Sequence, residues 1–272
     1  MRLRFHGVRG SIPTPEKGFM GVGGNTACVE VAVPGAPVVV MDAGTGARGL
    51  GNELVLAAGN GPLDVHLFLT HYHWDHIQGL PYFAPLYGPH SRLTIYGWET
   101  DGGLEALLTG QMHAPYFPVS WGAVPSEVRL RPLTPGRAVD LGPLSVVPFE
   151  LCHTQPTLGF RMSAHGASAV YATDHEHGAD RFDDNLRAAA AGADLLVCDA
   201  QYTPEEYEAR RGWGHTTWRE AVRFATDAGA ARLALFHHDP SHDDVTLAGV
   251  EREARAIHAG AILATEGLDV AV

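Results

Sequence analysis

The sequence predicts an α/β fold in which two β-sheets pack against each other and helices lie on the outside. Short apolar runs typical of strands occur in the first half of the chain and again after residue 140, with helical stretches among them. Sheets and amphipathic helices bury their apolar faces when they stack as layers. The chain has 272 residues and no long linker, internal repeat or low-complexity tract. We therefore expect a single domain that spans residues 1–272.

The strands are predicted from apolar runs of the length and composition that strands favour. Four of these runs lie in the first half of the chain, at residues 29–33, 38–41, 65–69 and 93–96. Five more follow residue 140, at residues 144–149, 158–162, 169–172, 195–198 and 233–236. This division into two sets is the reason for expecting two sheets.

The clearest helix is predicted over residues 217–228. Thr217 and Glu220 have the spacing of a capping box, an apolar stripe follows them, and Gly229 can end the helix. Two further helices are expected over residues 181–191 and from Asp243 or Asp244 to Gly260. Residues 110–125, by contrast, are rich in proline and aromatic residues without a regular period. We expect an ordered, packed loop there, with a lid or a dimer contact as alternatives.

The composition argues against several classes of protein. The formal net charge is −12 with histidines neutral, and this disfavours stable binding of nucleic acids, which is mediated by basic patches. The three cysteines include no CxxC pair, which predicts a reducing compartment and no disulfide framework. The N-terminus lacks a signal-peptide core, and no apolar run reaches membrane-spanning length. We therefore expect a soluble, cytoplasmic protein that does not bind membranes.

Residues 71–76, His-Tyr-His-Trp-Asp-His, are the most informative segment of the chain. Three imidazoles and one carboxylate within six positions form a dense set of ligands for a divalent metal. The segment follows a predicted strand, and in extended backbone His71 and His73 project to the same side. Asp75 and His76 come where the chain can turn into a helix, so they can diverge toward a second ion. The hexapeptide therefore predicts a metal centre with a natural geometry for two ions.

Three further candidate ligands stand at the ends of predicted strands, namely His153, Asp174 and His237. Strand ends at one edge of a sheet can converge on one cleft, where such folds place their function. Taken singly, each of these residues is more often a hydrogen-bonded loop residue than a ligand. At the last position the sequence leaves His237 and His238 open, because consecutive side chains of extended backbone face opposite ways and only one is expected to bind metal.

Together these residues resemble the metallo-β-lactamase superfamily, whose hallmark is His-x-His-x-Asp-His followed by a His, a bridging Asp and a last His at strand ends. The resemblance covers nearly the whole chain and implies an αββα sandwich of two mixed sheets flanked by helices. It also implies two divalent ions, with zinc first and manganese or iron as alternatives. The implied ligands are His71, His73 and His153 for one metal, Asp75, His76 and His237 for the other, and Asp174 as the bridge. Asp42 matches an early aspartate of the family that supports the site without binding metal.

Two further segments resemble the ribonuclease Z and cyclic phosphodiesterase branch of this superfamily. They are the glycine-containing N-terminal segment 5–13 and residues 214–217, Gly-His-Thr-Thr, which resemble the Gly-His-Ser-Thr motif of the branch. In ribonuclease Z the histidine of that motif is a proposed proton donor to the leaving oxygen, which implies this role for His215. Long-arm ribonuclease Z enzymes carry a tRNA-binding insertion between the third-motif histidine and the bridging aspartate. Here His153 and Asp174 are only 21 residues apart, so tRNA processing is not expected.

The sequence thus predicts a metal-dependent hydrolase, and specifically a phosphodiesterase that acts on small, cyclic phosphodiesters by metal-activated water. Asp75 is expected to orient that water and hold its proton, and His215 to protonate the departing alkoxide. Asp199, after the strand 195–198, either orients His215 or a metal ligand or closes a structural turn. Hydrolysis of a thioester or lactone and a non-catalytic metal-binding sensor remain as alternatives. The branch also suggests a homodimer.

Overall fold

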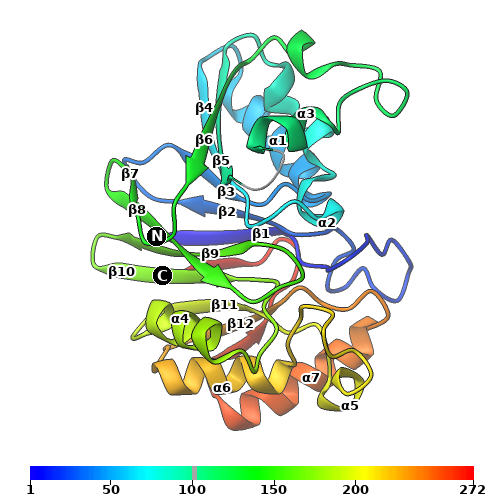
Figure 1. Cartoon of the computed structure of the whole chain (residues 1–272), viewed down its shortest axis with the longest axis vertical. Coiled ribbons are helices and arrows are strands. Elements are labelled where there is room, and N and C mark those ends of the chain that lie inside the picture. The colour runs from blue at the N-terminus through cyan, green and yellow to red at the C-terminus, as the bar shows by residue number, and fades with distance from the viewer. Residues whose placement is uncertain (100–102) are drawn as a thin grey trace.

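The computed structural model describes residues 1–99 and 103–272, which form two β-sheets packed face to face between layers of helices (Figure 1). The first sheet has the order β14-β1-β2-β3-β4-β5-β6. Neighbouring strands are antiparallel from β14 to β3 and parallel from β3 to β6. Its strands are β1 (Arg2–Gly7), β2 (Cys28–Ala32), β3 (Val38–Met41), β4 (Leu63–Phe68), β5 (Ser91–Trp98), β6 (Glu127–Leu133) and β14 (Asp269–Ala271).

The second sheet has the order β13-β12-β11-β10-β9-β8-β7 and is also mixed. Its neighbours are parallel from β13 to β10 and antiparallel from β10 to β7. Its strands are β7 (Val139–Leu141), β8 (Leu144–Leu151), β9 (Thr157–Ala164), β10 (Ala167–Ala172), β11 (Leu195–Asp199), β12 (Leu233–Phe236) and β13 (Ala261–Leu263).

Helices cover the outer face of each sheet (Figure 1). The first sheet carries α1 (Gly46–Ala58) and α3 (Leu104–Thr109), and the second carries α4 (Asp180–Ala190), α6 (Trp218–Ala228) and α7 (Asp244–Ile257). Short helical turns lie in the connections, namely α2 (Trp74–Ile77), η1 (Leu80–Tyr82), η2 (Ala84–Tyr87), η3 (Trp121–Ala123) and α5 (Pro204–Tyr207). This arrangement confirms the predicted αββα sandwich. Within the described residues, no helix is both long and apolar enough to cross a membrane.

Two apolar clusters hold the layers together. The larger one fills the space between the sheets and continues beneath α4, α6 and α7. In it Phe68 of the first sheet meets Phe160 of the second with ring centroids 5.6 Å apart, and Phe5 meets Phe236 at 5.9 Å. Full burial of a phenylalanine contributes about 1.5–3 kcal/mol, so these contacts fix how the sheets face each other. The smaller cluster lies between the first sheet and the layer of α1, η1 and η2.

All nine predicted strands are present, and each of the three predicted helices forms. The capping box before α6 is only half formed, because Thr217 Oγ1 accepts the Glu220 N–H at 3.1 Å while the Glu220 carboxylate pairs with Arg223. The prediction that α7 reaches Gly260 is wrong. The helix ends at Ile257, since His258 adopts extended backbone.

The sequence did not predict α1, because the glycines within residues 46–51 obscure its helical period. It also missed the edge strands β6, β7, β13 and β14 and the strand β1, whose pattern mixes charged and apolar residues. The loop 110–125 packs as expected through Phe117 and Trp121, which contact the smaller cluster. Tyr116, however, is 80% exposed.

Candidate metal centre

The predicted site residues gather at one edge of the sandwich, close to α2 in Figure 1. All of them except His215, which lies in the loop between α5 and α6, stand at or just beyond the C-terminal end of a strand, because parallel strands of a sheet end at the same edge. The strands and their residues are β3 with Asp42, β4 with the hexapeptide 71–76, β8 with His153, β10 with Asp174, β11 with Asp199 and β12 with His237.

The first cluster consists of His71, His73, His153 and Asp174, and one donor atom from each lies within 4.8 Å of all the others. His153 Nε2 is 3.1 Å from His73 Nδ1. Asp174 Oδ1 lies 3.7 Å from His71 Nε2 and 3.6 Å from His153 Nε2. Three imidazoles and a carboxylate oxygen therefore converge on one small volume.

The second cluster consists of Asp75, His76 and His237. His237 Nε2 lies 3.2 Å from both His76 Nε2 and Asp75 Oδ2. The other carboxylate oxygen of Asp174, Oδ2, is 3.1 Å from His76 Nε2 and 3.3 Å from His237 Nε2. Asp174 thus directs one oxygen to each cluster, which is the geometry of a bridging ligand.

The donor set fits divalent metal ions. His71 Nε2 is buried and has no hydrogen-bond partner among the described residues. The ring nitrogens of His76 and His237 face each other, as do those of His73 and His153. A metal cation that lies between two facing ring nitrogens can accept a lone pair from each of them. Imidazole and carboxylate ligands suit zinc, manganese and iron alike.

A second ring of contacts orients the histidines. In four of them Nδ1 contacts a fixed oxygen, which leaves Nε2 directed into the clusters. These contacts are His71 to Thr70 Oγ1 at 3.0 Å, His76 to Asp42 Oδ2 at 2.8 Å, His153 to the Gly214 carbonyl at 2.7 Å and His237 to Gln201 Oε1 at 2.9 Å. His73 is the exception and turns Nδ1 inward.

The structure distinguishes His237 from its neighbour. His237 points into the second cluster, whereas His238 Nε2 lies 2.9 Å from the Ala264 carbonyl on the other side of the chain. Burial lowers the pKa of His238 to about 3, so this side chain is a neutral hydrogen-bond donor. The alternative that His238 lies at the centre is thereby excluded.

Asp42 lies outside both clusters and supports them through hydrogen bonds. Its carboxylate accepts the backbone N–H of Thr70 at 2.8 Å, the Thr70 hydroxyl at 3.0 Å and the Tyr171 hydroxyl at 3.0 Å, in addition to contacting His76. The sequence anticipated Asp42 but not Thr70, Tyr171 or Gln201. The sequence does not indicate a role for Tyr171, since the residue fits the pattern of a buried strand like its apolar neighbours.

Backbone strain is concentrated at this edge. Five non-glycine residues in the described ranges have positive φ, and four of them are Ser11, Asp42, Asp174 and His237. Left-handed backbone raises the free energy of a residue that has a Cβ. It persists where the surrounding contacts hold the backbone in that conformation. At Asp42, Asp174 and His237 the chain therefore turns sharply at or just beyond the end of a strand.

Burial and charge set the protonation of the ligands. Burial lowers the pKa of His153 to about 4 and lowers the pKa of His71 and His73, which favours the neutral imidazole that binds metal. Burial alone would raise the pKa of Asp75 and Asp174, but the neighbouring histidines hold both values well below the usual range. Both carboxylates are therefore ionised.

His215 and Asp199 form a pair beside the clusters, and a donor atom of His215 also lies within 4.8 Å of donor atoms of Asp174 and His237. His215 Nδ1 lies 2.8 Å from Asp199 Oδ2, and Asp199 Oδ1 also accepts the backbone N–H groups of Gln201 and Thr216. Burial lowers the pKa of His215, but the Asp199 carboxylate outweighs it and raises the pKa to about 9. Asp199 thus both closes a turn and orients His215, so the two interpretations of its role are compatible.

A cavity of about 580 Å³ opens over these groups. Its walls include His73, Asp75, His153, Asp174 and His215. The N-terminal segment covers one side of it, where the Ser11 N–H donates to Asp75 Oδ2 at 2.6 Å. Gly10 packs so tightly against the His237 ring that a Cβ would lie 2.5 Å from Nδ1. This close approach explains why the segment has glycine at that position.

The comparisons with known proteins agree with this geometry. A family model described as a β-lactamase superfamily domain matches residues 38–238, which contain all seven candidate ligands. The chain belongs to the metallo-β-lactamase superfamily. Membership confirms the resemblance drawn from the sequence and, with it, the prediction of a metal-dependent hydrolase.

This superfamily member is similar over nearly its whole length to ribonuclease Z of Haloarcula marismortui, with 23% identity and coverage of 99% of this chain and 96% of the relative. Among solved structures it resembles the metallo-β-lactamase fold protein YhfI of Bacillus subtilis, with a TM-score of 0.73, 20% identity and coverage of 99% and 98%. A diphosphatase of the PhnP family gives a TM-score of 0.69, 22% identity and coverage of 100% and 97%.

Proposed function

We propose that this protein is a binuclear metal phosphodiesterase that hydrolyses small, cyclic phosphodiesters. One observation carries the proposal. Asp174, which directs one oxygen to each cluster, and His215, which Asp199 holds from behind, line the same cavity, so that a water activator and a proton donor face one space. Diester hydrolysis with a poor leaving group needs both functions.

The proposed ligands are those that the two clusters contain. His71, His73 and His153 would hold one ion, Asp75, His76 and His237 the other, and Asp174 both, with zinc proposed first and manganese or iron as alternatives. When bound, the two ions supply an activated water and neutralise phosphoryl oxygens. Asp75 lines the cavity with one oxygen fixed by the Ser11 N–H, so its carboxylate is placed to orient the attacking water and to hold its proton.

His215 is the proposed general acid. Its Nδ1 is held by Asp199, so Nε2 remains to face a departing alkoxide oxygen. The elevated pKa keeps the ring protonated at neutral pH, and the acid is therefore ready before the P–O bond breaks. The protonated ring gives its Nε2 proton to the alkoxide and is left neutral.

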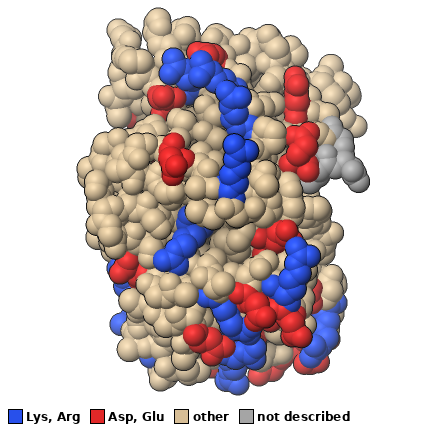
Figure 2. All heavy atoms as spheres, turned by 60° about the vertical axis from the view of Figure 1, so that its left-hand side comes forward, with Lys and Arg blue, Asp and Glu red and all other residues tan. Residues whose placement is uncertain are grey.

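A small substrate is favoured over a tRNA precursor. The alignment with the Haloarcula marismortui ribonuclease Z runs over 319 positions against 272 residues in this chain, so segments of that relative have no counterpart here. The net charge of −12 disfavours the binding of a polyanion such as tRNA. On the face that Figure 2 shows, basic side chains form a narrow line with carboxylates close by. At the edge of the first sheet, for example, Arg92 and Arg129 both pair with Glu127.

The test is a substrate panel on the purified, metal-loaded protein. We expect turnover of bis-p-nitrophenyl phosphate and of cyclic phosphodiesters, and much slower turnover of thioesters and lactones. Activity on thioesters or lactones alone would assign the site to that alternative chemistry. Cleavage of a tRNA precursor faster than any small diester would assign it to RNA processing, and a metal-replete protein inert on all classes would be a sensor.

A further inference from the structure

Two exposed tryptophans at the mouth of the metal cavity have no part in the proposed hydrolysis. Trp74 is 68% exposed and Trp213 is 61% exposed, and both line the cavity of about 580 Å³. Trp74 lies between His73 and Asp75 in the chain, and Trp213 lies two residues before His215. Both indoles therefore border the same space as the metal clusters. Large aromatic side chains exposed around a concave polar site mark contacts with a ligand.

The backbone under Trp213 is held in place. The Glu176 carboxylate accepts the Gly212 N–H at 2.6 Å with one oxygen and the Gly214 N–H at 2.8 Å with the other. The Trp213 N–H donates to the Arg210 carbonyl at 3.1 Å. A Cβ on Gly214 would lie 2.2 Å from His153 Nδ1, so this loop is pressed against the first cluster. The exposure of the Trp213 ring is therefore a feature of an ordered segment.

The backbone of Trp74 is also held in place, on the side of the cavity formed by the first sheet. It is the first residue of α2, and its carbonyl accepts the Gln78 N–H at 2.7 Å. Its neighbours in sequence belong to the two different clusters, so its backbone cannot shift without moving candidate ligands. The two indoles thus stand on hydrogen-bonded segments that follow β4 of the first sheet and β11 of the second, as a preorganised binding site requires.

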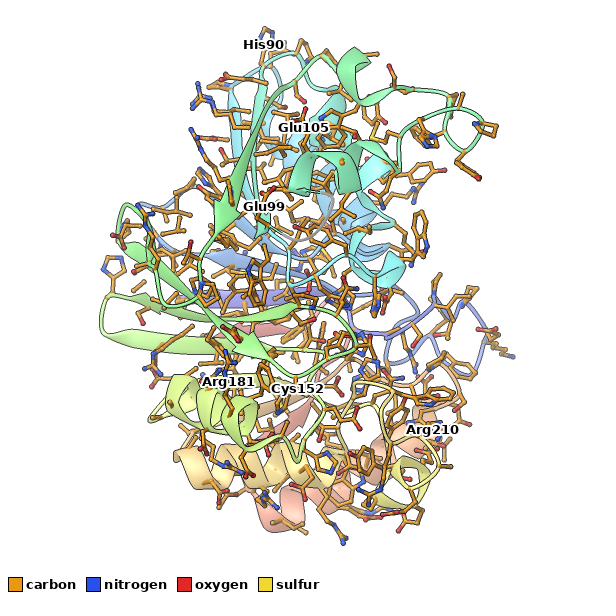
Figure 3. All side chains as sticks on the ribbon, viewed as in Figure 1. His90, Glu99, Glu105, Cys152, Arg181 and Arg210 are labelled. Atoms are coloured by element: carbon orange, nitrogen blue, oxygen red, sulfur yellow. The ribbon has the colours of Figure 1, made fainter. Side chains whose placement is uncertain are left out.

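One cationic side chain, Arg210, also lines the cavity. Among the described residues that line the cavity, Arg210 is the only arginine or lysine. Its guanidinium stacks over the Tyr202 ring at 5.0 Å from the centroid and lies 3.8 Å from Glu206. Figure 3 shows Arg210 beside α5, at the outer part of the second sheet's helical layer. A stacked guanidinium offers donors to a phosphate or to the edge of a base.

We propose that Trp74 and Trp213 form a nucleobase subsite, so that the substrate is a nucleotide diester and not a base-free sugar or glycerol phosphate. This inference rests on the proposed phosphodiesterase function and names its substrate class. Every nucleobase presents a π-face, and stacking on aromatic side chains is tolerant of base identity. The subsite therefore accepts purines and pyrimidines, and it selects for the presence of a base.

The test compares two ligands that differ only in the base. The affinities of AMP and ribose 5-phosphate for the metal-loaded full chain are measured by titration calorimetry. We expect AMP to bind about tenfold or more tightly than ribose 5-phosphate. Trp74→Ala and Trp213→Ala should each bring this ratio toward one, whereas Trp74→Phe and Trp213→Phe should largely retain it. Tyr116→Ala, which removes an exposed aromatic ring that does not line the cavity, is the matched control.

Hydrolysis of bis-p-nitrophenyl phosphate is measured on the same samples, so that the two proposals can fail separately. Equal binding of AMP and ribose 5-phosphate by the unaltered protein would overturn the subsite while leaving the diesterase activity intact. A ratio that survives both alanine substitutions would overturn it as well. A clear AMP preference in a protein that hydrolyses no phosphodiester would keep the subsite and remove the proposed reaction.

Discussion

The two walls of the metal cavity are built in different ways. The wall from the first sheet takes its candidate ligands from residues 71–76, which are neighbours in the chain and follow one strand. The wall from the second sheet takes His153, Asp174 and His237 from the ends of three strands. Asp199 and His215 belong to the second wall too. The candidate ligands of the first wall are neighbours in sequence, whereas those of the second wall come together only when the second sheet forms.

This difference separates two tasks. The first wall, supported by Asp42 and Thr70, provides four candidate ligands, among them Asp75 with its proposed role toward the attacking water, and Trp74 at its rim. The second wall provides three candidate ligands, including the proposed bridge Asp174, together with the proposed acid and the loop that carries Trp213. Four of the candidate ligands therefore lie in one compact motif, whereas the proposed acid and the proposed bridge come into place only when β10, β11 and β12 lie side by side.

The largest effect is expected where the walls meet. Asp174→Ala removes the residue that faces both clusters, so the metal content should fall below two ions per chain by elemental analysis. Diesterase activity should fall by about 1000-fold or more, since several kcal/mol of charge stabilisation are lost. Asp183→Asn is the control, because that buried carboxylate pairs with His175 outside the clusters. Two ions retained by Asp174→Ala would exclude a bridging role.

The next effect concerns the second wall alone. His215→Ala should lower turnover of dialkyl diesters by about 100- to 1000-fold and turnover of bis-p-nitrophenyl phosphate far less, since a good leaving group needs no acid. Metal content should stay at two ions. His177→Ala, which removes a contact to Thr216 behind the cavity, should affect both substrates alike. Equal losses for both substrates in His215→Ala would mean that His215 only positions the substrate.

Asp199→Asn tests whether this acid depends on its partner. The substitution weakens a charge-assisted hydrogen bond worth about 1.5–3 kcal/mol, so turnover of dialkyl diesters should fall by about 10- to 100-fold. In a protein that already carries His215→Ala, Asp199→Asn should add little further loss, because the two residues act as a unit. Fully additive losses would show that Asp199 acts on something other than His215.

On the first wall, Asp42→Asn should weaken metal affinity by about 10- to 100-fold, because Asp42 orients His76 without binding metal. Competition with a chelator measures this change. Tyr171→Phe, which removes one hydrogen bond to the same carboxylate, should have a smaller effect in the same direction. Unchanged affinity in Asp42→Asn would mean that the second cluster holds its own orientation.

The smallest effect is on stability. Thr217→Ala removes the cap of α6 directly after the His215 loop and should lower the free energy of unfolding by about 1 kcal/mol, as measured by urea titration of the metal-loaded protein. The metal content should remain at two ions. A loss of metal in this variant would show that the second wall depends on the start of α6 for its shape.

The sequence by itself determined most of the scaffold and the list of candidate ligands. Apolar runs identified the buried strands, because a strand buried on both faces is continuous in its hydrophobicity. The motif in residues 71–76 needed no tertiary information, since its ligands are adjacent in the chain. Amphipathic helices with clear ends, such as α6, were also evident, whereas the glycine-rich α1 and the half-exposed edge strands were not.

Only the tertiary structure decided which groups meet at the second wall. His237 enters the site and His238 leaves it because positive φ at His237 turns the chain at the end of β12. The contacts of His237 with Gln201 and of His153 with the Gly214 carbonyl join segments that are far apart in sequence. They form because β10, β11 and β12 pair as parallel neighbours. Local periodicity predicts which face of an element is apolar, but it does not predict which strand ends become neighbours in the folded sheet.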